Sequence, residues 1–241
     1  MIGVSEADAK VELPPRYHTR WQDPFEDRIR ARLREGMTVL DVGSGRTPTL
    51  LPAERPPNTR YVGLDLSDEE LRRAGPGAYD ELVAADVATG VPALVGTVDL
   101  AVSWQVFEHI KPLGAALDNL HAYLKPGGTL ISLFSGRWSA FGVVNRLIPN
   151  AIGGRLVERS MRRQGTNQPV FPAHYDRCTY SALTRMMTSG WSEVEIHPLF
   201  RAATYFHFSR PLTRVYLAYE NAARRAGLSD LATHYLLIAR R

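Results

Sequence analysis

Short apolar runs alternate with helical or loop segments through most of this 241-residue chain. Apolar runs of strand length that are separated by helices are typical of βαβ units, whose parallel strands are buried on both faces. The runs are MTVLDV (37–42), RYVGLDL (60–66), ELVAADV (81–87), VDLAVSW (98–104), GTLISLF (128–134), Trp191 to His197 and THYLLIARR (233–241). The final run follows an irregular stretch, and a sheet that ends this way often has an antiparallel edge strand. The pattern predicts an α/β fold with a doubly wound, mostly parallel seven-stranded sheet.

The segments between the runs predict helices and insertions within one domain, 1–241. Residues 21–36 have Phe25, Ile29 and Leu33 at four-residue spacing, one stripe of a helix that ends at Gly36. The other predicted helices span residues 112–124, 180–189 and about 207–226. We expect an N-terminal tail (1–16) and helix within 1–36, a core (37–134), a helical lid insertion (135–178), and a C-terminal part of the sheet with a second insertion (179–241).

The composition predicts an ordinary globular protein, with 44% hydrophobic and 22% charged residues. The net charge is only +4, and among 29 basic residues only Lys10, Lys111 and Lys125 are lysines. Without a basic patch, such arginine usage does not predict a nucleic-acid partner. Cys178 is the only cysteine, which excludes an intrachain disulfide. No signal sequence or apolar run of about 20 residues appears, so we expect a cytoplasmic protein.

The sequence VLDVGSGRT predicts a ligand-binding turn. A buried strand ends at Asp41, and Gly43, Ser44 and Gly45 are expected to turn into a helix. Glycines at such a turn lack Cβ atoms, so the backbone bends sharply and approaches a ligand closely. A glycine-rich loop in this strand-to-helix setting is a stronger signal than the glycines alone.

Two further acids end the next predicted strands. Asp65 lies 20 residues after Gly45, the separation at which a carboxylate reaches ribose hydroxyls, and Asp86 ends the following strand. Each acid could instead be an N-cap or loop carboxylate. A dinucleotide is disfavoured, because Pro48 replaces the third glycine and Asp41 would repel a pyrophosphate. An acid there suits a cationic ligand.

These features, with the pair Glu108-His109 and the segment Leu124-Lys125-Pro126-Gly127-Gly128, resemble class I S-adenosylmethionine-dependent methyltransferases. The resemblance is to the broad group that includes ubiquinone-pathway and natural-product enzymes. It covers residues 37–134 well and 170–200 loosely, and Thr47 stands where the family normally has a small residue. It implies a Rossmann-like fold and S-adenosyl-L-methionine as the cofactor.

The resemblance also implies a role for each residue of the cofactor site. It places Asp41 near the ammonium group of the cofactor. Gly43, Ser44 and Gly45 would lie against the methionine part. On the adenosine side, Asp65 would hold the ribose hydroxyls and Leu66 would pack on the adenine ring. Asp86 and the Val87 backbone would bind the adenine edge. The sulfonium side would be lined by Ser103, Trp104 and Gln105.

Candidate catalytic residues follow the fourth strand and the lid. His109 is the first candidate general base, since its ordinary pKa is close to neutrality; Glu108-His109 could instead cap or orient the next helix. His174 and Tyr175 form a second candidate pair near the acceptor, although Tyr175 could be a packed aromatic residue. Some relatives bind a divalent ion through Glu-x-x-Glu-His. Here Gln105 replaces the first carboxylate, so no metal is predicted.

The two insertions are the expected acceptor region. Residues 135–178 are apolar and arginine-rich, which suits a hydrophobic or anionic small molecule, contact with a membrane surface, or a solvated helix. The aromatic residues of 200–222 could line a pocket or fill a core. We expect a methyltransferase for a small molecule, with oxygen as the favoured acceptor, in secondary or lipid/quinone-like metabolism. The alternative is a protein that keeps this fold and binds the cofactor without methyl transfer.

Overall fold

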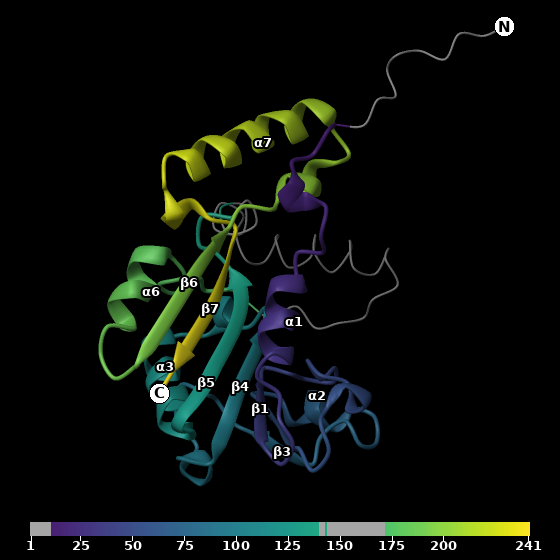
Figure 1. Ribbon diagram of the computed structural model, residues 1–241, viewed down its shortest axis with the longest axis vertical. Helices are drawn as coiled ribbons and strands as arrows, with labels where there is room; N and C mark the ends of the chain where they lie inside the picture. The colour runs from purple at the N-terminus through teal and green to yellow at the C-terminus, as the bar shows by residue number, and fades with distance from the viewer. Residues whose placement is uncertain (1–10, 140–142, 144–171) are drawn as a thin grey trace, which may run out of the picture.

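The computed structural model describes residues 11–139, 143 and 172–241, and these residues form a seven-stranded sheet (Figure 1). The strand order is β3-β2-β1-β4-β5-β7-β6, and β7 runs antiparallel to both β5 and β6. The expected mostly parallel sheet with antiparallel pairing at one edge is therefore confirmed, and β7 lies one strand inside that edge. The strands are β1 (Thr38–Val42), β2 (Arg60–Asp65), β3 (Glu81–Ala84), β4 (Val98–Trp104), β5 (Leu124–Ser135), β6 (Glu193–Leu199) and β7 (His234–Arg240).

Helices cover both faces of the sheet, as a doubly wound fold requires. On one face, α3 (Leu113–Tyr123) and α6 (Tyr180–Met186) contribute Leu117 and Leu183 to the larger core cluster. On the other face, α1 (Asp23–Arg30) buries Phe25 and Ile29 against side chains of β1, β4 and β5. The predicted stripe of 21–36 therefore forms a helix, but one that ends at Arg30.

The helix expected after Gly45 does not form. Between β1 and β2 the chain is an irregular loop with a 3₁₀ turn at Pro52–Glu54. Pro48, Pro52, Pro56 and Pro57 lack the backbone N–H donors that a helix in this stretch would need. Beneath this crossover, α1 from the N-terminal segment packs with Leu50 and supplies apolar cover.

The remaining helices lie around the ends of the strands. The short α2 (Asp68–Arg72) follows β2, and Ser67 caps it by accepting a 3.2 Å hydrogen bond from the Glu70 N–H. The long α7 (Arg210–Arg225) lies across one end of the molecule (Figure 1). Arg16, the last residue of the expected tail, and Tyr17 both bind the buried Glu220 carboxylate of α7.

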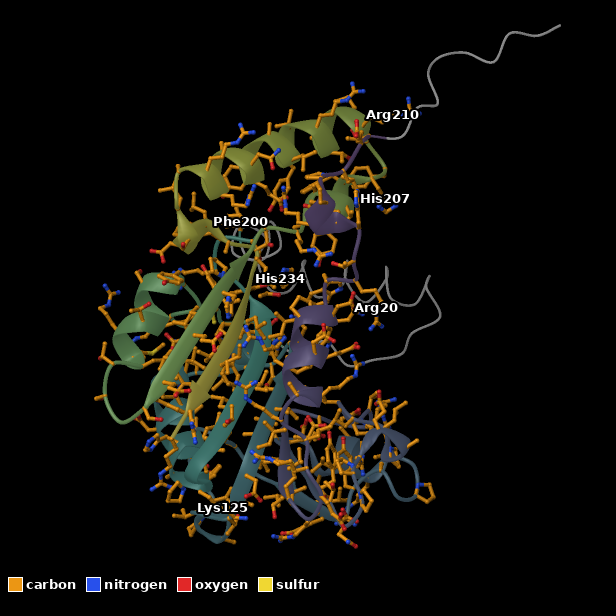
Figure 2. The ribbon with its side chains drawn as sticks, viewed as in Figure 1. Arg20, Lys125, Phe200, His207, Arg210 and His234 are labelled. Atoms are coloured by element: carbon orange, nitrogen blue, oxygen red, sulfur yellow. The ribbon has the colours of Figure 1, made fainter. Side chains whose placement is uncertain are left out.

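Figure 2 marks the two ends of the sheet with Lys125 and His234. His234 pairs in register with Ser135, the last residue of β5, so it marks the end of the sheet where the carboxyl ends of the parallel strands lie. Its ring packs on Trp21, with 4.9 Å between centroids. Most of the predicted lid, 140–142 and 144–171, lies outside the described residues. Among the residues the structure describes, no helix is long and apolar enough to cross a membrane.

Candidate functional site

Two adjoining cavities open at the carboxyl ends of the parallel strands. The strand-end cavity has a volume of about 360 Å³ and lies against the ends of β1, β2 and β4. The loop cavity has a volume of about 560 Å³ and lies between the loop 43–49 and α1. Gly43, Asp65 and Trp104 line both cavities. The two cavities are therefore adjacent.

Gly43 has a backbone conformation and surroundings that only glycine fits. Its φ is +71°, the left-handed region that favours glycine, and its N–H donates to the Leu64 carbonyl at 2.7 Å. A Cβ atom here would overlap the Val106 side chain. Ser44 and Gly45 continue the wall of the loop cavity.

Asp65 and Leu66 present two different surfaces at the end of β2. The Asp65 carboxylate accepts hydrogen bonds from the N–H groups of Gly45 (2.9 Å) and Ser67 (2.8 Å), while burial raises its pKa. The side chain of Leu66 lines the strand-end cavity and Leu66 remains 71% exposed. An exposed leucine beside a fixed carboxylate suits a ligand that has both an apolar face and hydroxyl groups.

The third acid and its neighbour complete this wall. Asp86 lines the strand-end cavity and also accepts a 2.8 Å hydrogen bond from the Ala88 N–H, so it is at the same time a loop carboxylate. Val87 lines the cavity and is buried. Trp104 packs against Trp21 and Phe25, with ring centroids 4.7 Å and 5.2 Å away.

Asp41 and Ser103 line neither cavity. Asp41 is fully buried, and its carboxylate accepts hydrogen bonds from the Thr49 N–H (2.6 Å), the Thr49 hydroxyl (2.7 Å) and the Tyr61 hydroxyl (2.6 Å). Burial raises its pKa to about 6. Ser103 is buried and donates to the Val42 carbonyl at 3.3 Å. Asp41 therefore holds the loop through Thr49, and Ser103 joins β4 to β1.

Comparisons with known proteins agree with this geometry. The profile of a family described as a methyltransferase domain matches residues 16–189. The chain belongs to the class I S-adenosylmethionine-dependent methyltransferases. The cofactor of this family is S-adenosylmethionine.

Individual relatives are more distant. Trans-aconitate 2-methyltransferase of Azoarcus is 36% identical over 42% of this chain and 40% of its own length. Ubiquinone biosynthesis O-methyltransferase of Paramagnetospirillum magneticum is 32% identical over 40% of each chain. The chain therefore spans about two fifths of these two relatives. Geranyl diphosphate C-methyltransferase of Streptomyces coelicolor has the same fold, with a TM-score of 0.54, 15% identity, and coverage of 90% of this chain and 75% of the other.

His109 and His174 line the strand-end cavity beside Pro172. The His109 Nδ1 lies 3.1 Å from the Pro172 carbonyl. Since a carbonyl only accepts, this contact is a hydrogen bond in the tautomer that carries its proton on Nδ1, and in that tautomer Nε2 is free to accept a proton. The His174 N–H donates to the Glu108 carbonyl at 2.8 Å, which ties the end of the lid segment to the turn after β4.

The other candidates around the fourth strand lie differently. Tyr175 is buried and lines neither cavity, as the alternative of a packed aromatic residue expects. Gln105 lines the strand-end cavity, where its Oε1 accepts a hydrogen bond from the Ser135 hydroxyl at 2.9 Å. Glu108 is buried, which raises its pKa. The aromatic residues of 200–222 line neither cavity, and Phe206 packs on Tyr216 with 4.7 Å between centroids.

The structure adds a wall to the candidate site that the sequence did not predict. Its residues come from α1 and the residue before it, from the loop and from α2, and they are Gln22, Phe25, Glu26, Arg46 and Glu70. Arg46 pairs with Glu70 through two hydrogen bonds, of 2.6 Å and 2.7 Å. The one available signal was the spacing of Gln22, Phe25 and Glu26, which places them on neighbouring turns of the predicted helix.

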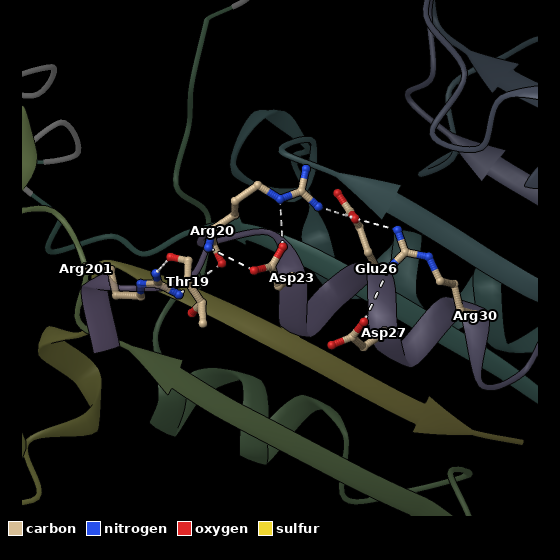
Figure 3. A network of polar contacts seen from close by, with 7 residues as sticks. All are labelled: Thr19, Arg20, Asp23, Glu26, Asp27, Arg30 and Arg201. Atoms are coloured by element: carbon tan, nitrogen blue, oxygen red, sulfur yellow. Dashed lines mark hydrogen bonds and ion pairs between the residues drawn. The ribbon is translucent and has the colours of Figure 1, made fainter. Parts of the chain in front are cut away.

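Ion pairs within and just before α1 hold the side chain of Glu26 (Figure 3). Glu26 accepts from Arg20 at 2.6 Å and from Arg30 at 2.7 Å, and Arg20 also binds Asp23 at 2.8 Å. Arg201 donates to the backbone carbonyls of Thr19 and Arg20. The start of α1 is thereby joined to the segment after β6, and Glu26 is held at the loop cavity.

Proposed function

We propose that this chain transfers a methyl group from S-adenosylmethionine to an oxygen atom of a hydrophobic or anionic small molecule. The observation that supports this most is the convergence of Gly43, Asp65, Leu66, Asp86 and His109 on one cavity at the strand ends. The glycine, the two carboxylates and the exposed leucine suit a nucleoside cofactor. The histidine nitrogen suits removal of a proton from the acceptor.

The strand-end cavity suits the adenosine part of the cofactor. Leu66 would pack on the adenine ring, and Asp86 with the Val87 backbone would bind its edge. Asp65 would accept the ribose hydroxyls, because its oxygens hold lone pairs beyond the two N–H bonds that they accept. The methionine part would then pass Gly43 and extend along Ser44 and Gly45 into the loop cavity.

Arg46 is our candidate for the carboxylate of the methionine part. The charged side chains that line the loop cavity are Glu26, Asp65, Glu70 and Arg46, so Arg46 is the one cation among the described residues there. Its pair with Glu70 uses Nε and Nη2, which leaves the donors of Nη1 for a second carboxylate. Asp41 is buried behind the loop, and we now assign it to holding Thr49 rather than the ammonium group.

When bound, the cofactor supplies a methyl group that is already activated by a sulfonium. The remaining task of the protein is to align an acceptor lone pair with that methyl group and to exclude water. An oxygen acceptor also requires removal of a proton. We assign this step to His109 Nε2, with His174 as the second candidate at the same cavity.

The class of acceptor rests on the curated relatives and on the sequence of the insertions. One relative is named for trans-aconitate, which is an anion, and another for ubiquinone biosynthesis by O-methylation. Both acceptor types agree with the arginines and apolar residues of 135–178. Oxygen remains our preferred acceptor atom over carbon.

Methyl-labelled S-adenosylmethionine tests this function when it is incubated with the protein and a small-molecule extract of the source cells. A labelled, base-sensitive or phenolic O-methyl product in the mass spectrum would support the proposal. A product labelled on carbon would refute the oxygen assignment. Tight binding of S-adenosylhomocysteine with no labelled product from any extract fraction would favour the alternative of a fold that binds the cofactor without methyl transfer.

A further inference from the structure

Helix α7 exposes a stripe of large apolar side chains. Leu212, Val215 and Tyr219 are three and four residues apart, so they share one side of the helix. Val215 is 69% exposed, and Phe208, just before the helix, is 72% exposed. A contiguous exposed apolar surface of this kind marks a binding surface more often than isolated exposed residues do.

The adjoining side of α7 is already occupied by the protein. Thr213, Glu220 and Ala223 are buried. The Glu220 carboxylate binds Arg16, Tyr17 and the Ala202 N–H. This inner side anchors the helix through Glu220 and meets the apolar stripe at Ala223, four residues after Tyr219.

The charge on the exposed side of α7 has one sign. Glu220 is the only acid in residues 207–228, and it is fully buried. Arg214, Arg224 and Arg225 are exposed and form no ion pair with the part of the chain that the structure describes. At 100° per residue, Arg214 and Arg225 lie about 100° and 80° around the helix from Val215, on the flank away from the buried residues. The helix thus combines an apolar stripe with a cationic flank.

We propose that α7 binds flat on the surface of an anionic lipid bilayer. Large apolar side chains bordered by arginines are the composition of interfacial helices, because the apolar stripe enters the acyl boundary while the arginines reach the headgroups. An acidic protein partner would match the arginines alone and would leave Val215 and Phe208 without a reason for their exposure. The helix also lies at one end of the molecule (Figure 1), where a flat surface can meet it.

Vesicle sedimentation with the full chain tests this surface. The wild type should bind vesicles of equal parts phosphatidylcholine and phosphatidylglycerol, and not phosphatidylcholine alone. Val215→Asp should lower the partition coefficient by at least about tenfold, and Arg214→Gln by about fivefold. Val95→Asp is the matched control, since Val95 is 55% exposed on a different part of the surface and should bind like the wild type. Thermal melting of each variant verifies that it is folded.

Three results would overturn the proposal. The first is equal binding of the wild type to both kinds of vesicle. The second is unchanged binding of folded Val215→Asp. The third is a wild type that binds no vesicles and sediments as a dimer, together with a monomeric Val215→Asp; this result would assign the stripe to a second copy of the chain.

Discussion

The Asp65 carboxylate accepts a 2.9 Å hydrogen bond from the backbone N–H of Gly45, 20 residues earlier in the chain. This bond joins the end of β2 to the loop after β1, and the two cavities meet at that point. Because no helix follows Gly45, the loop depends on such side-chain contacts for its shape. The Tyr79 hydroxyl adds another by donating to the Gly45 carbonyl at 3.0 Å.

Gly43→Ala should destabilise the protein and weaken S-adenosylhomocysteine binding. Alanine at φ +71° costs about 1–2 kcal/mol, and overlap with Val106 adds about 1–3 kcal/mol. Gly36→Ala is the matched control, because its φ is +72° but its Cβ would meet no atom within 4 Å. Urea unfolding of both variants separates the two costs. Equal losses of stability would show that Val106 does not require the glycine.

Arg46→Gln should weaken S-adenosylhomocysteine binding by about 10–100-fold, the effect of losing a charge-assisted hydrogen bond. Binding of methylthioadenosine, which lacks the amino acid part, should stay unchanged. Arg73→Gln is the control, since Arg73 also pairs with Glu70 but does not line the loop cavity. Calorimetric titration measures the affinity of the wild type and of both variants for each ligand. Equal weakening of both ligands by Arg46→Gln would mean that Arg46 only supports the fold.

Asp41 should make the stability of the protein depend on pH. Burial raises its folded-state pKa from 3.8 to about 6, so the proton is held more tightly in the folded than in the unfolded chain. The resulting stability is fully present below about pH 4 and is lost as the pH rises through about 6. Relative to Asp41→Asn, the free energy of unfolding of the wild type should therefore fall by up to about 3 kcal/mol between about pH 4 and pH 7. Urea titrations across this range measure it, and a constant difference would refute the assignment.

His109→Ala should lower turnover by about 10²–10⁴-fold, as expected when a general base is removed, while S-adenosylhomocysteine affinity stays unchanged. His121→Ala serves as the control. The His121 Nε2 also bonds a backbone carbonyl, that of Gly190, but the residue lines neither cavity. Single-turnover rates with the identified acceptor provide the measurement. An unaffected rate in His109→Ala would transfer the role of base to His174.

The sequence predicts the sheet well, because each strand is an apolar run followed by a turn signal. It fails at the helix after Gly45, where the glycine pattern suggested a helix start but four prolines in 48–57 prevent one. It also treats Phe25 only as part of a core stripe. The residue is indeed buried, yet it lines the loop cavity as well, and this second contact depends on tertiary packing that periodicity does not encode.

Asp41 and Asp65 show why strand-end acids cannot be assigned from sequence alone. Both lie at the carboxyl end of a buried strand, at the same end of the sheet. The Tyr61 and Thr49 hydroxyls surround Asp41, whereas Asp65 meets two backbone N–H groups and remains at the cavity. This difference depends on Tyr61 and Thr49, which lie 20 and 8 residues away in the chain. No local pattern reports it.

The affinity of Asp65→Ala for S-adenosylhomocysteine tests the central claim most directly, namely that the strand-end cavity holds the ribose of the cofactor. We predict a loss of about 10–100-fold, from the hydroxyl bonds to a charged acceptor. Asp99→Ala is the control, since Asp99 also accepts a backbone N–H, that of Thr38 at 2.8 Å, but at the opposite end of the strands. Its affinity should equal that of the wild type. An unchanged affinity in a folded Asp65→Ala protein would contradict the site proposed for the cofactor.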